Sequence, residues 1–283
     1  GKAFSRDEVR GKVMRAYMGL VKQCDDQMGV LFDWLEETGR MQDTMIVLTS
    51  DHGDFLGDHW LGEKTFFFDA STKVPLIIYD PSSEADSTRG TNCDELVEST
   101  DLVPTFIDIA GGDPASIEHM LEGKSLAPML HGTKNEPLRD FVICEYDYSM
   151  NPLAARLELG PDEGRMCMIA NKKWKMIHFE GGFRPMLFDL ANDPDELNDL
   201  GASDTHVEIL SAMYDQLNGG ARRPSQRTTI SHQEVLQLRK GMLAPRGVFV
   251  GVVDEADVTA DLKSKYVGKK ATDKRARPTT SGH

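Results

Sequence analysis

The sequence predicts an α/β protein in which a layered sheet, incomplete in this chain, precedes a small antiparallel sheet-and-helix subdomain and an extended tail. Three observations support this. A long helical pattern leads into a short apolar strand, helix and strand patterns then alternate, and short strand-like runs follow after about residue 160. We expect residues 1–160 to belong to an α/β domain, 161–222 to form the subdomain, and 223–283 to form the tail.

The individual elements follow from periodicity and from turn residues. Apolar residues recur every three or four positions from about Asp7 to Glu37, which predicts a helix that stops at Gly39. A short helix with its cap near Thr100 is expected to end at Gly111. β-rich runs predict strands at 45–49, 74–79 and 141–145, an antiparallel meander at 165–170, 173–179 and 186–190, and then a helix at 207–217.

Composition limits the classes of function. The chain has 283 residues, 40% of them hydrophobic, which is enough to bury a sizeable core. The net charge of −14 argues against a nucleic-acid partner, and an anionic substrate would need local positive charge. No apolar run reaches the length of a membrane span, so no membrane partner is expected. No signal-peptide pattern is visible, which favours the cytoplasm while leaving localisation open.

The cysteines give no sign of a disulfide framework or a zinc site. They are widely scattered and form no CxxC pair. We therefore expect reduced thiols at Cys24, Cys93, Cys144 and Cys167.

The most informative segment is the end of the strand predicted at 45–49. Asp51 and His52 follow it directly, and a carboxylate and an imidazole at one strand end can both bind a transition metal. The same residues also fit a simple turn, with Asp51 bonding nearby amides and Gly53 supplying an unusual dihedral. A second histidine, His59, and a glycine-flanked Lys64 favour the metal site. Two ligands do not complete such a site, so others must come from elsewhere.

Several motifs, in one order along the chain, resemble the sulfatase branch of the alkaline phosphatase superfamily. The resemblance covers roughly Arg10 to Leu217. The segment Gly57-Asp-His-Trp-Leu-Gly-Glu-Lys64 is most similar to bacterial phosphonate monoester hydrolases and arylsulfatases. The other matching motifs are Thr49-Ser-Asp-His-Gly53, Val74-Pro-Leu-Ile77, Ser99-Thr-Asp-Leu-Val-Pro-Thr105, Gly123-Lys-Ser-Leu126, and Leu187-Phe-Asp-Leu190 with Asp193-Pro-Asp-Glu196.

The resemblance implies a metal-dependent hydrolase of sulfate or phosphonate/phosphate esters, with a small anionic ester as substrate. It implies one divalent ion (Ca, Mn, Zn or Fe) and a formylglycine made from Cys or Ser in a C/S-x-P-x-R motif. Asp51 and His52 resemble two of the metal ligands. Lys64 resembles the lysine that binds the anionic group and stabilises developing charge. His59 belongs to the same motif, with bracing of the loop as its alternative role.

The departures from the family pattern leave other hypotheses open. No C/S-x-P-x-R motif is present, so the sequence resembles the C-terminal portion of such an enzyme, and formylglycine is expected only in a preceding part. The chain alone should then be a poor catalyst. A second hypothesis is a non-catalytic assembly fragment, with oligomer contacts at 226–238 and 242–258, and a homo-oligomer through the tail is expected. A third is a mutase or nucleotide phosphodiesterase branch of the superfamily.

Overall fold

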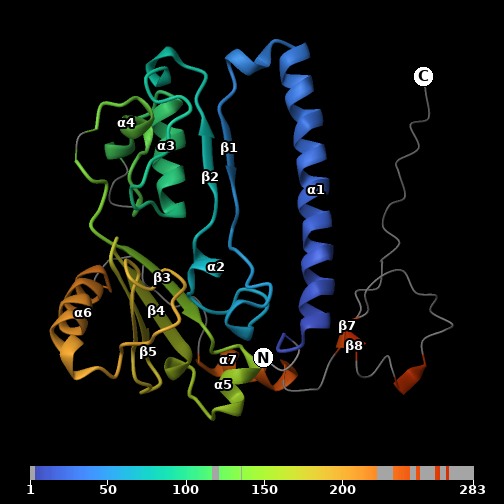
Figure 1. The fold of residues 1–283 in the computed structure, drawn as a ribbon, viewed down its shortest axis with the longest axis vertical. Helices are drawn as coiled ribbons and strands as arrows, with labels where there is room; N and C mark the ends of the chain where they lie inside the picture. Colours follow the sequence, from blue (N-terminus) through green and yellow to red (C-terminus); the bar gives the residue numbers. More distant parts are fainter. Residues whose placement is uncertain are drawn as a thin grey trace. The chain divides into compact units, whose positions relative to one another are not determined.

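The computed structural model describes residues 4–116, 121–134, 136–221, 232–242, 247–248, 259–261 and 266–267 (Figure 1). The chain divides into two compact units. The first combines residues 1–146 with 166–227, and the second combines 147–165 with the chain from residue 228 onward. All the residues of the predicted site lie in the first unit.

The first unit begins with a long helix and a short antiparallel ladder. Helix α1 spans Asp7–Glu37, which confirms the predicted helix, and Gly39 follows it with a left-handed φ of 70°. Strand β1 (Ile46–Thr49) pairs with β2 (Leu76–Tyr79) in an antiparallel register. A layered central sheet was expected. Within the described residues these two strands form a ladder of their own, and helix α2 (Asp69–Thr72) lies in the connection between them.

The segment after Ser99 contains the predicted short helix. Residues Ser99–Asp101 form a 3₁₀ turn that continues into helix α3 (Leu102–Ile109). The cap is a reciprocal pair, in which the carboxylates of Glu98 and Asp101 accept each other's backbone N–H groups. Helix α3 has its N-cap at Asp101, next to the predicted position near Thr100, and Glu98 caps the 3₁₀ turn that precedes it. Helix α4 (Ala127–Leu130) follows.

The predicted antiparallel meander is confirmed. A four-stranded sheet has the order β3-β4-β5-β6, in which β4 pairs antiparallel with β5 and β5 with β6. Helix α6 (Val207–Ala221) packs on it, and together they bury Ile169, Met176, Leu187, Met213 and Leu217. The strands are β3 (Val142–Asp147), β4 (Arg165–Ala170), β5 (Trp174–Phe179) and β6 (Met186–Asp189).

The second unit contains helix α5 (Pro152–Arg156), helix α7 (His232–Met242) and the short parallel pair β7 (Gly247–Val248) and β8 (Tyr266–Val267). The predicted oligomer contacts at 226–238 and 242–258 lie largely outside the described residues. Among the described residues, no helix has both the length and the apolarity that a membrane span requires. Short 3₁₀ turns occupy Arg40–Gln42, Asp58–Trp60, Ser83–Ala85, Asp162–Gly164 and Asp204–His206.

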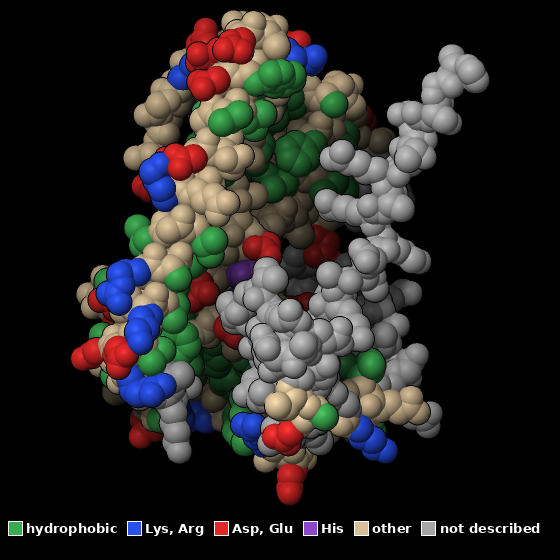
Figure 2. All heavy atoms as spheres, turned by 90° about the vertical axis from the view of Figure 1, so that its right-hand side faces the viewer, with side chains coloured by type: hydrophobic (Ala, Val, Ile, Leu, Met, Phe, Trp, Pro, Cys, Tyr) green, Lys and Arg blue, Asp and Glu red, His purple; other side chains and the backbone are tan. Residues whose placement is uncertain are grey.

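Helix α1 leaves most of its apolar stripe in contact with solvent. Only Leu35 is buried, whereas Leu20 and Leu31 are 60% and 48% exposed. Figure 2 shows a face of the molecule on which hydrophobic side chains reach the surface between charged ones. Such exposure of large apolar side chains along one helix is unusual for a surface that faces only water.

Candidate metal and anion site

The candidate site begins where β1 ends and the chain turns toward α2. The backbone N–H of Gly53 donates to the carbonyl of Ser71 at 2.8 Å. A Cβ atom on Gly53 would lie 2.0 Å from the carbonyl oxygen of Ala70, so no larger residue fits. Gly53 does not have a positive φ, so the predicted unusual dihedral is wrong. The glycine is needed for close approach of two backbone segments.

His52 is held in one tautomer by its own loop. Its Nδ1 atom lies 2.7 Å from the carbonyl oxygen of Gly53. A carbonyl can only accept, so the hydrogen-bond network assigns the proton to Nδ1 and leaves the lone pair on Nε2. This is the arrangement in which an imidazole binds a metal through Nε2.

Two charged side chains meet the Nε2 atom of His52. The ammonium of Lys64 lies 2.6 Å from it, and Oδ2 of Asp51 lies 3.3 Å from it. Asp51 also accepts the N–H of His52 at 3.0 Å, which is the local bond that the turn interpretation expected. The structure thus brings Asp51, His52 and Lys64 together, although Lys64 is twelve residues away from His52.

The site is open and polar rather than enclosed. The side chain of Asp51 is 83% exposed and that of His52 is 37% exposed. Ser71 holds the backbone near Lys64. Its hydroxyl donates to the Phe66 carbonyl and makes a longer contact, 3.3 Å, with the Lys64 carbonyl. The ammonium of Lys64 can therefore meet an anion that arrives from solvent.

The donors fit part of a metal shell. A carboxylate oxygen and a neutral imidazole nitrogen at one strand end are suitable ligands for a divalent ion. Among the described residues, no group of three His, Cys, Asp or Glu side chains gathers in a way that could hold an ion. Asp51 and His52 can supply two ligands, and the rest of the shell would have to come from outside the described part of the chain.

His59 lies against an aromatic side chain. Its ring stacks on Phe68 with centroids 3.7 Å apart and planes 4° apart. The loop around it has positive φ angles at four residues that are not glycine, which is costly and needs support from packing. This contact fits the bracing role. The four residues are Leu56, His59, Trp60 and Glu63.

Sequence reasoning missed the support behind the site. The motif Asp193-Pro-Asp-Glu196 forms a turn, since the N–H of Glu196 donates to the carbonyl of Asp193 at 3.0 Å. The turn also buries Glu196 against Lys175 and the start of α2. The available sequence signal was the charged Lys175, which stands directly before the apolar pair Met176 and Ile177 of β5.

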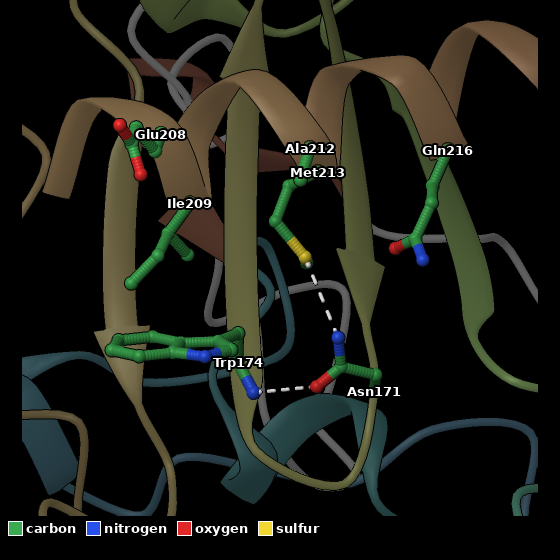
Figure 3. A pocket seen from close by; sticks show the side chains of 7 residues that line it. All are labelled: Asn171, Trp174, Glu208, Ile209, Ala212, Met213 and Gln216. Carbon is green, nitrogen blue, oxygen red and sulfur yellow. Dashed lines mark hydrogen bonds between the residues drawn. The ribbon is translucent and has the colours of Figure 1, made fainter.

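A small hollow elsewhere does not include the site. Its volume is about 260 Å³, and it lies between the β4–β5 turn and α6 (Figure 3). Asn171 there donates to Met213 Sδ at 3.6 Å and accepts from the N–H of Trp174. The lining residues are Asn171, Trp174, Glu208, Ile209, Ala212, Met213 and Gln216, which include none of the predicted site residues.

Comparison with known proteins identifies the family. The family model described as N-sulphoglucosamine sulphohydrolase, C-terminal, matches residues 57–223. The chain is 32% identical to the multifunctional alkaline phosphatase superfamily protein PehA of Trinickia caryophylli, over 74% of this chain and 40% of that protein. It is 32% identical to an arylsulfatase of Clostridium perfringens, over 68% of this chain and 37% of that protein.

A solved structure agrees with this assignment. The phosphonate monoester hydrolase SpPMH from Silicibacter pomeroyi matches with a TM-score of 0.70 and 29% identity, over 81% of this chain and 45% of that one. The fold and the motifs define a member of the alkaline phosphatase superfamily. The chain belongs to the sulfatase family within it, close to phosphonate monoester hydrolases and arylsulfatases. It spans roughly two fifths of the length of these relatives, with 40%, 37% and 45% covered.

Proposed function

We propose that this chain is the C-terminal part of a metal-dependent hydrolase that cleaves small sulfate or phosphonate esters. The observation that carries the proposal is the meeting of Asp51, His52 and Lys64 at the end of β1, in a chain whose relatives are arylsulfatases and phosphonate monoester hydrolases. Asp51 and His52 would hold one divalent ion. That ion would supply Lewis-acid polarisation of an ester oxygen.

Lys64 would bind the anionic group of the ester. Its ammonium now occupies the lone pair of His52 Nε2 at 2.6 Å. One lone pair cannot serve both an ammonium and a metal ion, so Lys64 would leave Nε2 when His52 acts as a ligand. The exposed ammonium then pairs with a sulfate or phosphonate oxygen and stabilises charge that develops on it. A formylglycine nucleophile would have to come from a preceding part of the protein.

The test uses the complete protein with an aryl sulfate and an aryl phosphonate. We expect Asp51→Ala to abolish metal retention, because it removes one of two ligands that this chain supplies. We expect Lys64→Ala to retain the metal and to lose about 10²–10³-fold in kcat, as for other charge-stabilising groups. Asp58→Asn, an exposed change in the same loop, is the control. Retained metal and unchanged activity in Asp51→Ala would remove the assignment.

The assembly hypothesis is based on the C/S-x-P-x-R motif, which this sequence does not contain. Under it, the chain would serve as an oligomer contact and would not act on an ester. Light scattering before and after deletion from Gln226 separates the two functions. A number of chains per particle that does not change on deletion argues against an oligomer formed through the tail.

A further inference from the structure

A buried cation lies behind the site. Lys175, on β5, is 1% exposed, and its ammonium has three acceptors around it. It lies 2.7 Å from Oε1 of Glu196, 2.5 Å from Oδ1 of Asp69 and 3.2 Å from the carbonyl oxygen of Phe67. The ammonium donates hydrogen bonds to Asp69 and Phe67, and its contact with Glu196 is an ion pair. Two of these acceptors, Asp69 and Phe67, belong to the chain at the start of α2.

Glu196 connects the same cation to the first turn of α2. Its side chain is 2% exposed, and its second oxygen accepts the backbone N–H of Asp69 at 2.6 Å. The backbone of Glu196 has a φ of 54°, a region that costs energy for any residue with a side chain. A glycine would avoid this cost, so the carboxylate itself accounts for the use of glutamate there.

Helix α2 then holds both ends of the site loop. The Ser71 carbonyl accepts the N–H of Gly53, the residue directly after His52. The Ser71 hydroxyl donates to the carbonyl of Phe66 and makes a longer contact of 3.3 Å with the carbonyl of Lys64. Phe68, just before α2, stacks on His59 of the loop. A shift of α2 would therefore move His52 and Lys64 relative to each other.

We propose that Glu196 and Lys175 are positioning residues, which fix α2 and, through Ser71, fix the backbone segments that carry His52 and Lys64. Their catalytic relevance rests on the proposed function, whereas the anchoring can be measured without it. Groups that orient metal ligands from behind typically matter about 10–100-fold in metal affinity or activity. A buried ion pair is not required for stability alone, because apolar residues of similar volume often replace one without loss.

The first measurement is amide hydrogen exchange of the chain, at Gly53 and in a reference segment, α3. We expect Glu196→Gln to speed exchange at Gly53 by about tenfold or more, because it removes a charged partner of the α2 anchor. Lys175→Met with Glu196→Leu should keep the thermal midpoint and still speed exchange at Gly53. Glu196→Gly relieves the positive φ and should have the same local effect.

The matched control is Lys73→Met. Lys73 pairs with the other oxygen of Asp69 at 3.8 Å, but its side chain is 80% exposed. We expect this substitution to leave exchange at Gly53 unchanged, because an exposed pair contributes little. It removes a lysine ammonium from Asp69, as Lys175→Met does, and the two lysines differ mainly in burial.

The outcomes separate the two proposals. Unchanged exchange at Gly53 in all three Glu196 variants overturns the positioning role. An increase of equal size in α3 also overturns it, since the residues would then be merely structural. In the complete protein, the variants should lose about 10–100-fold in kcat/KM. If the unsubstituted protein neither holds metal nor hydrolyses either ester, the proposed function fails, and the exchange result still decides the anchoring.

Discussion

At the scale of single residues, Asp101 in the motif Ser99–Thr105 has a structural role. The Asp101 carboxylate is fully buried and receives both terminal nitrogens of Arg139 at 2.5 Å. It also accepts the backbone N–H groups of Glu98 and Lys124 at 2.7 Å. Burial opposes ionisation of Asp101, but these hydrogen bonds outweigh it and hold the pKa below the usual 3.8. This acid therefore braces the fold and does not belong to the site.

Replacement of Asp101 should destabilise the chain strongly. We expect Asp101→Asn to cost about 3–5 kcal/mol in the free energy of unfolding, because it breaks a buried ion pair and leaves the guanidinium of Arg139 only the carboxylate of Glu98, 3.4 Å away. Asp86→Asn is the matched control, since Asp86 pairs with Arg89 at 2.9 Å on the surface and should cost at most about 1 kcal/mol. Chemical denaturation measures both. Equal effects would mean that the Asp101 pair is no stronger than a surface pair.

The same carboxylate predicts how stability depends on pH. Its pKa is lower in the folded chain than in the unfolded chain, so its contribution is complete above about 3.8, the unfolded value. The contribution is lost as pH falls through the lower, folded pKa. Asp80 acts in the same direction. Burial raises its pKa, but hydrogen bonds from Ser82 and His131 lower the pKa by more than burial raises it. We expect the thermal midpoint to fall on acidification below pH 4, and less steeply in Asp101→Asn.

At the scale of elements, the contact of β1 with α2 depends on a missing side chain. Gly53→Ala would place a methyl group 2.0 Å from the Ala70 carbonyl oxygen, and backbone must move to relieve that contact. We expect a loss of about 1–3 kcal/mol in the free energy of unfolding. Gly29→Ala is the matched control, because that site in α1 has no atom within 4 Å of the added carbon. It should stabilise by about 0.5–1 kcal/mol. Stabilisation by both substitutions would contradict the close approach.

Elements with a local pattern could be predicted from the sequence, and contacts between distant elements could not. The apolar period of α1 and the short runs between turn residues in β4 to β6 are local signals, which is why those elements were predicted. The antiparallel pairing of β1 with β2 depends on which segment lies alongside, and no period encodes that. The bond from Asp69 to Glu196 joins residues 127 positions apart, so the turn was visible in sequence and its buried partner was not.

The site residues show the same difference between local signals and contacts of distant segments. Asp51 and His52 could be placed together because they are adjacent and follow a strand. The approach of Lys64 to His52 requires a loop with four residues at positive φ that are not glycine, a conformation that propensity disfavours. The glycine-flanked Lys64 favoured a site, and resemblance to the sulfatase family indicated its role in binding the anionic group. Packing of the loop against α2 supplies the physical reason.

At the scale of the whole molecule, the apolar stripe of α1 should govern how this chain behaves alone. Leu20 and Leu31 lie on that stripe, and both are largely exposed, in a chain with a net charge of −14. Charge repulsion opposes association, whereas exposed apolar area favours it. We expect the chain to bind an apolar-surface dye and to self-associate as its concentration or the salt concentration rises, because salt screens the repulsion.

A paired substitution tests this balance. Leu20→Glu with Leu31→Glu should lower dye binding and self-association, measured by fluorescence and light scattering. It should change the free energy of unfolding by no more than about 0.5 kcal/mol per site, because both side chains already contact solvent. Lys12→Glu with Lys22→Glu adds negative charge at two exposed positions of the same helix and removes no apolar area. If this control lowers dye binding equally, net charge and not the stripe controls association. If the leucine pair unfolds the chain, those leucines are buried in the folded molecule.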